Sequence, residues 1–176
     1  MDRHSKKIAN LERMRALAAY DLFNPGLGER LQAICRHSAE RLGMPIAAVQ
    51  AVLDTATATL AATATLGASE GEHLVVATGG GPNEFAFCPQ VVLDDVPFVA
   101  DDLARHPIHG ANPIVRAGLI RSYAGVPLWL PSGHMLGAHC VMGGEPHAFT
   151  DADLAELAAA GEQAVAAIRD YELART

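Results

Sequence analysis

Apolar side chains recur every three or four positions in three parts of the chain, and this period predicts three long helices. The first is expected from about Asp2 to Tyr20, with Arg13 among the charged side chains on its exposed side. The second covers about residues 27–42 and ends at Gly43, where a left-handed cap suits glycine. The third follows a threonine cap with acidic residues in the first turn and covers about residues 151–174.

Continuous or alternating apolar runs predict the strands of one sheet. Two strands are expected at residues 46–53 and about 58–66, and a short one at 97–100. Residues 122–130 and 135–142 flank a Pro-Ser-Gly-His turn and are predicted to pair as an antiparallel hairpin.

The middle of the chain is less regular. The apolar run at 73–78 fits either a third strand or a helical turn, and Gly79 to Pro82 is expected to be a flexible break. Two short helices are predicted to begin at a proline, one directly after Cys88 and one directly after Asn112. In those positions Cys88 and Asn112 act as caps, and a thiol at a cap feels the positive end of the helix dipole.

This order of elements is segregated rather than alternating, which predicts an α+β fold with one antiparallel sheet covered by helices. Residues 21–176 are expected to form a single domain, and residues 1–20 a signalling or dimerisation helix ahead of it. The apolar stripe of that helix must be buried. It packs either on the last helix of its own chain or on the equivalent helix of a partner.

Charge and composition exclude several classes of protein. The 176 residues include 20 acidic and 13 basic side chains, a net charge of −7 that opposes non-specific binding to nucleic acid. Residues 1–15 are polar and basic, unlike a signal peptide, and the longest uncharged stretch, 55–69, is too short to span a bilayer. A cytoplasmic protein with no membrane partner is expected. Its three cysteines suit reduced thiols better than a disulfide framework.

With these elements in place, the chain resembles the GAF family of small-molecule-sensing modules, over about residues 25–172. It is similar to GAF modules attached to bacterial phosphatases, histidine kinases and diguanylate cyclases. The matching segments are Phe87-Cys88, residues 97–101, Asn112-Pro113, residues 123–128, residues 133–137, Cys140-Val141 and Phe149-Thr150.

The resemblance implies a sheet of about five or six antiparallel strands. It places the terminal helices on one face, often paired with those of a second subunit, and short helices and loops over a pocket on the other face. It also implies a sensor that is not an enzyme and forms a homodimer through its terminal helices. Since no output domain is recognisable in the sequence, the module is expected to act in trans on a signalling partner or through its terminal helices.

The same resemblance suggests the region of a small-molecule site. The candidate ligand-binding residues are Phe87, Cys88, Val92, His106, Asn112, Val115, Tyr123 and His139. The ligand and any cofactor are unknown, and no catalytic residue is assigned. No metal site is expected, because His139 and Cys140 are neighbours on a strand and point to opposite faces, and no CxxC or HExxH motif occurs.

Two other functions remain open at this stage. Free methionine sulfoxide reductases share the fold, and such an enzyme would use Cys88 to attack the sulfoxide and a second thiol to resolve the product. Cys35 and Cys140 are predicted on a buried helix face and in a strand, unlike the loop thiols of the reductases. A dimerisation module with a closed pocket is the third alternative.

Overall fold

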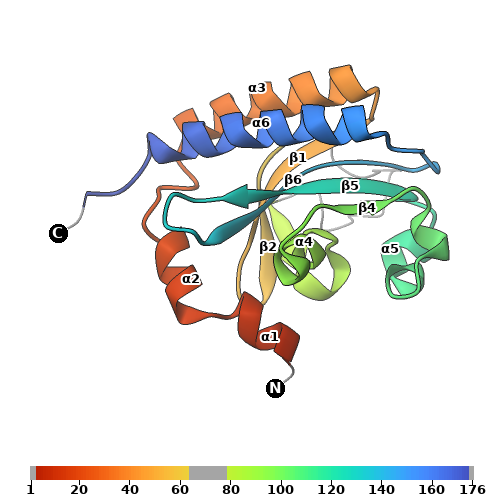
Figure 1. Cartoon of the computed structure of the whole chain (residues 1–176), viewed down its shortest axis with the longest axis horizontal. Helices are drawn as coiled ribbons and strands as arrows, with labels where there is room; N and C mark the ends of the chain where they lie inside the picture. The colour runs from red at the N-terminus through yellow and green to blue at the C-terminus, as the bar shows by residue number, and fades with distance from the viewer. Residues whose placement is uncertain (1–2, 64–78, 175–176) are drawn as a thin grey trace.

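The computed structural model describes residues 3–63 and 79–174, which form a six-stranded sheet with helices on both faces (Figure 1). The strand order is β3-β2-β1-β6-β5-β4, and every pair is antiparallel. Its strands are β1 (Ile46–Val52), β2 (Ala56–Ala62), β3 (Gly80–Pro82), β4 (Phe98–Ala100), β5 (Ser122–Trp129) and β6 (Met135–Gly143). The predicted α+β fold with five or six antiparallel strands is confirmed.

Two long helices lie side by side across one face of the sheet (Figure 1). The helix α3 (Pro25–Leu42) is capped by Asn24 and ends at Gly43, whose φ of 62° is the left-handed conformation that glycine favours. The helix α6 (Asp151–Arg169) begins with a capping box of Thr150 and Asp153. Their apolar stripes and the side chains of alternate strand positions form one hydrophobic core.

Short elements cover the opposite face, where a second hydrophobic core lies. They are the helices α4 (Cys88–Asp94) and α5 (Pro113–Arg116) and the 3-10 turns η2 (Asn83–Phe85), η3 (Leu103–Arg105) and η4 (His109–Ala111). Asn112 caps α5 as predicted, because its side chain accepts from the backbone N–H of Ile114. Cys88 is the first residue of α4 rather than its cap, a position that Phe87 takes.

The N-terminal segment corrects the prediction of one helix from Asp2 to Tyr20. It forms two short helices, α1 (Arg3–Ile8) and α2 (Leu11–Leu17), because Asn10 stops the first and caps the second. The two helices lie below one end of the sheet in Figure 1, and α1 reaches α4. Arg13, predicted to be exposed, is 4% exposed and donates to the carbonyls of Ile8, Val52, Met135 and Leu136.

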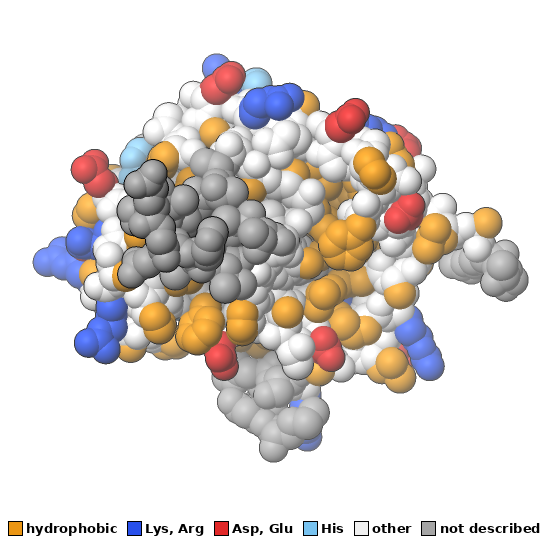
Figure 2. All heavy atoms as spheres, turned by 180° about the vertical axis from the view of Figure 1, so that it is seen from behind, with side chains coloured by type: hydrophobic (Ala, Val, Ile, Leu, Met, Phe, Trp, Pro, Cys, Tyr) orange, Lys and Arg blue, Asp and Glu red, His pale blue; other side chains and the backbone are white. Residues whose placement is uncertain are grey.

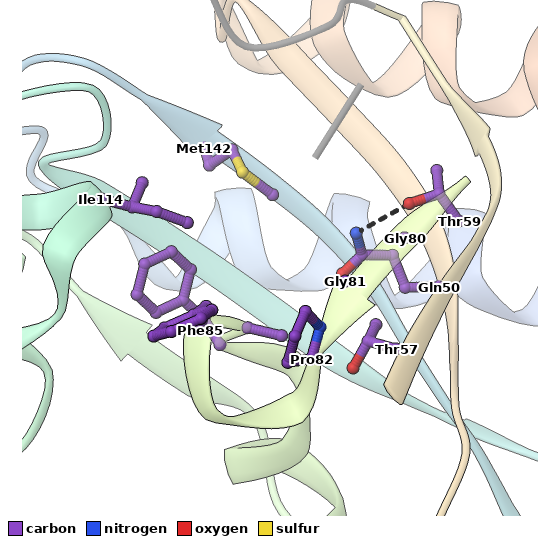
Figure 3. Close-up of a pocket in the computed structure, with 11 residues that line it drawn as sticks. Gln50, Thr57, Thr59, Gly80, Gly81, Pro82, Phe85, Ile114 and Met142 are labelled. Carbon is purple, nitrogen blue, oxygen red and sulfur yellow. Dashed lines mark hydrogen bonds between the residues drawn. The ribbon is translucent and has the colours of Figure 1, made fainter. Parts of the chain in front are cut away.

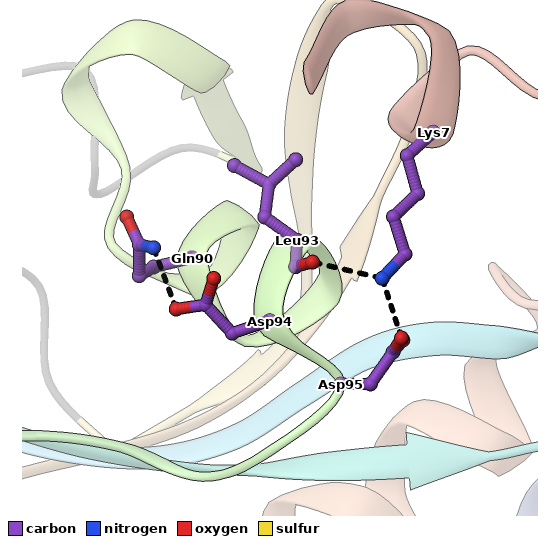
Figure 4. Close-up of polar contacts among 5 residues, drawn as sticks. All are labelled: Lys7, Gln90, Leu93, Asp94 and Asp95. Atoms are coloured by element: carbon purple, nitrogen blue, oxygen red, sulfur yellow. Dashed lines mark hydrogen bonds and ion pairs between the residues drawn. The ribbon is translucent and has the colours of Figure 1, made fainter. Parts of the chain in front are cut away.

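A second contact fastens α1 to the roof of the sheet (Figure 4). The Lys7 ammonium donates to the carbonyl of Leu93 at 2.8 Å and pairs with Asp95 at 2.5 Å. These groups lie at the C-terminal end of α4, where a cation is favourable to the helix dipole. Ile8 is buried in the core beside them.

The irregular middle of the chain gives one further correction. The Gly79 to Pro82 segment was predicted to be a flexible break, but Gly80–Pro82 is strand β3 and pairs with β2. The run at 73–78 lies outside the described residues.

Within the described residues, no helix combines the length and apolar character needed to cross a membrane. From behind, hydrophobic side chains lie mostly over the centre and lower part, and charged ones mostly near the rim (Figure 2).

Candidate functional site

Four buried side chains meet beneath α4, and we call them the thiol cluster: Gln50, Cys88, Tyr123 and Cys140. The Cys88 sulfur lies 2.8 Å from Gln50 Oε1, 3.0 Å from the Tyr123 hydroxyl and 3.8 Å from the Cys140 sulfur. An amide oxygen only accepts, so the Cys88 thiol donates to Gln50 and the Tyr123 hydroxyl donates to the Cys88 sulfur. Both thiols and the tyrosine are 0% exposed.

The register of the sheet brings these residues together. Tyr123 pairs with Met142, and Gly125 pairs with Cys140, so the tyrosine and the thiol are near neighbours on one face. Gly125 leaves the space over which the Tyr123 ring lies, because a Cβ atom at Gly125 would come within 2.3 Å of the Tyr123 hydroxyl oxygen. Gln50 reaches the same place from β1, two strands away.

Burial favours the neutral forms of Tyr123 and Cys140. It raises the pKa of Tyr123 well above its usual value, and the nearby Cys88 and Cys140 add to the rise. The hydrogen bond with Cys88 and then burial raise the pKa of the Cys140 thiol well above its usual value. Cys35, on the helix-covered face, is separate from this cluster, and burial raises the pKa of its thiol to about 12.

A small cavity of about 50 Å³ lies directly beside the cluster, between the sheet and the short elements that roof it (Figure 3). Its polar wall comes from Gln50, Thr57 and Thr59, and the Gln50 amide nitrogen donates to the Thr59 hydroxyl at 3.3 Å. The remaining lining residues are apolar or glycine: Gly80, Gly81, Pro82, Phe85, Ala86, Phe87, Ile114 and Met142. No charged side chain is among these described lining residues.

The structure brings some of the eight candidate residues together and separates others. Phe87 lines the cavity, and Cys88 and Tyr123 contact each other one side chain behind its wall. Val92 and Val115 belong to the same core without lining the cavity. These two side chains are therefore packing residues of the roof.

Asn112 and His106 lie farther out. Asn112 caps α5 and donates to the carbonyl of Phe85, so it holds a segment of the cavity roof without facing the cavity. His106 stacks edge-on against Phe98, and its Nδ1 accepts from the backbone N–H groups of Ile108 and His109. Its contacts shape the loop beyond the roof.

His139 lies on the other face of the sheet, under α3, and this placement removes it from the pocket. Its Nδ1 lies 2.9 Å from the Ala48 carbonyl and its Nε2 2.8 Å from the Ser38 hydroxyl. A carbonyl only accepts, so Nδ1 carries the proton and Nε2 accepts from Ser38. Period-two alternation already separates His139 from Cys140, which contacts Cys88 on the roofed face.

Sequence reasoning missed Gln50, Thr57 and Thr59, which form the polar wall. Gln50 carried a readable signal, because it is the single polar residue in the apolar strand Ile46–Val52. The alternation within that strand puts Gln50 on the face opposite to Val49. The threonines could not be distinguished from ordinary strand residues. Among the described residues, no three His, Cys, Asp or Glu side chains are grouped as metal ligands would be.

The chain belongs to the GAF domain family, whose sequence model matches residues 26–169. Among curated proteins, no match to this chain is found.

Several solved structures share the fold. The type II free methionine-R-sulfoxide reductase of Thermoplasma acidophilum is 17% identical with a TM-score of 0.64, over 87% of this chain and 99% of that one. The GAF domain of an Acinetobacter phosphoenolpyruvate-protein phosphotransferase is 13% identical with a TM-score of 0.62, over 97% and 96%. The Neisseria meningitidis free methionine-R-sulfoxide reductase, solved with its substrate, is 19% identical with a TM-score of 0.60, over 97% and 94%. At these identities the likeness extends to the fold alone.

Proposed function

We propose that this GAF domain is a sensory module without catalytic activity, which binds a small uncharged molecule in the cavity between the sheet and its roof. Membership of the GAF family supports a sensory or regulatory role in signalling. The observation that carries the proposal is the cavity itself, with an amide and two hydroxyl groups on one side and apolar groups on the other. Such a wall offers hydrogen bonds to a polar ligand and no charge to balance an ionic one.

Size narrows the ligand further. A cavity needs about 10–15 Å³ of volume to hold one water, so a cavity of about 50 Å³ suits a ligand of a few heavy atoms unless the roof moves. The cavity roof includes Phe87, directly ahead of α4, and Ile114 of α5, both on short elements. Ligand binding would therefore act on the segments at α4 and α5 as well as on the strands that line the cavity.

A thermal-shift assay of the full chain tests the proposal, with small uncharged amides and alcohols from acetamide to glycerol as probes. At least one probe is expected to raise the midpoint, because a ligand at 100 times its Kd stabilises by about 2.7 kcal/mol. Thr59→Val is expected to remove the shift, whereas Thr55→Val, an exposed threonine outside the cavity, should keep it. No shift with any probe, or equal shifts in both variants, would overturn the proposal.

A reductase is the second candidate, favoured by one observation: Cys140 lies within reach of Cys88 as a resolving thiol. In that reaction two thiols reduce a sulfoxide to a thioether and water, and a disulfide forms. The small cavity and the complete burial of both sulfurs favour the sensor. Assays of thiol-dependent reduction of free methionine-R-sulfoxide would decide, since activity abolished by Cys88→Ser supports the enzyme.

Other assignments stay predictions. A homodimer through the terminal helices, with residues 1–20 as a dimerisation segment, is tested by mass-resolved oligomer size. Action on a signalling partner and a cytoplasmic location are tested by co-purification and by fractionation of cells that make the protein.

A further inference from the structure

We propose that Cys88 and Cys140 form a reversible disulfide, which makes the thiol cluster a redox-sensitive site. The two sulfurs lie 3.8 Å apart, so they must approach by roughly 1.8 Å to reach the S–S bond length of about 2.05 Å. Cys140 is held in the central strand β6, and Cys88 begins the seven-residue helix α4. A small shift of the first turn of α4 supplies this approach without disturbing the sheet.

The third cysteine sets this pair apart. Cys35 is also 0% exposed, but it is a residue of α3 on the opposite face of the sheet, where its sulfur contacts the Ala61 carbonyl at 3.8 Å. All three cysteines are free thiols in the structure. Burial is therefore common to all three, and direct sulfur–sulfur contact is given by Cys88 and Cys140 alone among them.

A peroxide is the class of oxidant that fits the site. The Cys88 thiol is oxidised by hydrogen peroxide to a sulfenic acid, and one water is released. The Cys140 sulfur then attacks the Cys88 sulfur, the hydroxyl leaves with the Cys140 proton as a second water, and the S–S bond forms. Two thiols thus lose two electrons and two protons, and one peroxide becomes two waters. A dithiol reductant reverses the change.

The route for the oxidant runs through the cavity. Phe87 lines the cavity and directly precedes Cys88, and Gln50 lines it while its Oε1 contacts the Cys88 sulfur. Hydrogen peroxide has two heavy atoms and fits a cavity of about 50 Å³. Movement of the Gln50 side chain, which borders the cavity and contacts the sulfur, would admit the peroxide to Cys88.

Oxidation also changes the cavity wall. Once Cys88 is part of a disulfide its sulfur carries no proton, so the hydrogen bond from Cys88 to Gln50 Oε1 is lost. Gln50 must then find another partner, and it is one of the three polar lining residues. This consequence for ligand binding rests on the proposed function, whereas disulfide formation itself does not.

Thiol counting on the full folded chain tests the proposal. The protein is treated with hydrogen peroxide under native conditions, quenched with acid, unfolded and alkylated, and its disulfides are mapped by mass spectrometry. Wild type is expected to fall from three alkylatable thiols to one, with a Cys88–Cys140 crosslink. The matched control Cys35→Ser should fall from two to zero, and Cys140→Ser should give no intramolecular crosslink. Dithiothreitol should restore every lost thiol.

Two results would overturn the inference. One is that wild type keeps three alkylatable thiols after hours in excess peroxide and, in a separate experiment, in diamide, while circular dichroism shows that it stays folded. The other is a mapped crosslink that includes Cys35. If Cys140→Ser does not fold, wild type and Cys35→Ser still decide. None of these readouts requires a ligand, so a failed thermal-shift screen and a failed crosslink are separate results.

Discussion

Replacement of Arg13 by methionine tests whether a buried arginine holds the N-terminal segment on the sheet. Arg13 is 4% exposed and donates hydrogen bonds of 2.5 to 3.0 Å to four backbone carbonyls. They belong to α1, to the end of β1 and to the start of β6, so one guanidinium joins three segments of the chain. Burial lowers its pKa to about 10, which leaves it charged at neutral pH.

Methionine keeps much of the stem and removes every donor. A buried acceptor left without a partner costs about 1–3 kcal/mol. A surface groove borders Arg13 and Met135, so water can reach part of the vacated space. With two of the four carbonyls left without a donor, Arg13→Met should lower the free energy of unfolding by about 3 kcal/mol. Urea unfolding followed by circular dichroism should show a midpoint lower by about 1–2 M.

Arg15→Met is the matched control, because Arg15 lies on the same helix and is exposed. It should change the free energy of unfolding by less than about 0.5 kcal/mol. Arg13→Lys keeps the charge but not the planar fork of donors, so its loss should lie between the two. Equal midpoints for Arg13→Met and Arg15→Met would refute the reasoning.

Two further predictions concern the sheet. Burial lowers the pKa of His139, so the native state resists protonation of this side chain. The free energy of unfolding should therefore fall as the pH drops below about 6.5, the pKa of histidine in the unfolded chain, by up to about 1.4 kcal/mol per pH unit. Urea midpoints at pH 7.5, 6.5 and 5.5 should decline less in His139→Gln, and parallel declines would contradict this. Gly125→Ala should destabilise by about 1–3 kcal/mol, because its Cβ would meet the Tyr123 hydroxyl. Gly28 lies in a helix with open space around it, so Gly28→Ala should instead raise the free energy of unfolding by about 0.5–1 kcal/mol, measured by thermal or urea unfolding. Similar losses of stability in the two variants would contradict the packing argument.

The helices and strands could be predicted from the sequence where a cap, a turn or the apolar period was clear. Helix caps and apolar period located α3 and α6, and β-propensity with a turn located the hairpin of β5 and β6. The N-terminal segment failed for a physical reason. Its apolar period continues through Asn10, whereas the cap that Asn10 forms and the tertiary contacts of Arg13 with the ends of two strands favour a break there.

The site was less predictable than the fold. Cys88 and Tyr123 were expected in one place and do meet, because α4 packs on the face of β5 and β6 to which Tyr123 points. The cavity wall was missed because it depends on which face of β1 and β2 is roofed, and sequence period gives alternation without saying which side is which. His139 was expected in the pocket but faces α3, whereas Gln50 was not expected there but lines the cavity.

The helix α4 links the thiol cluster and the cavity to the N-terminal segment. Its first residue, Cys88, belongs to the thiol cluster, and the residue before it lines the cavity. Its last turn is bonded to Lys7 of α1 through the Leu93 carbonyl and Asp95 (Figure 4). Because packed elements move as rigid bodies, a ligand or a disulfide that shifts the first turn of α4 must also change the contacts at its last turn. The N-terminal segment thus directly contacts the end of α4 opposite to the proposed site.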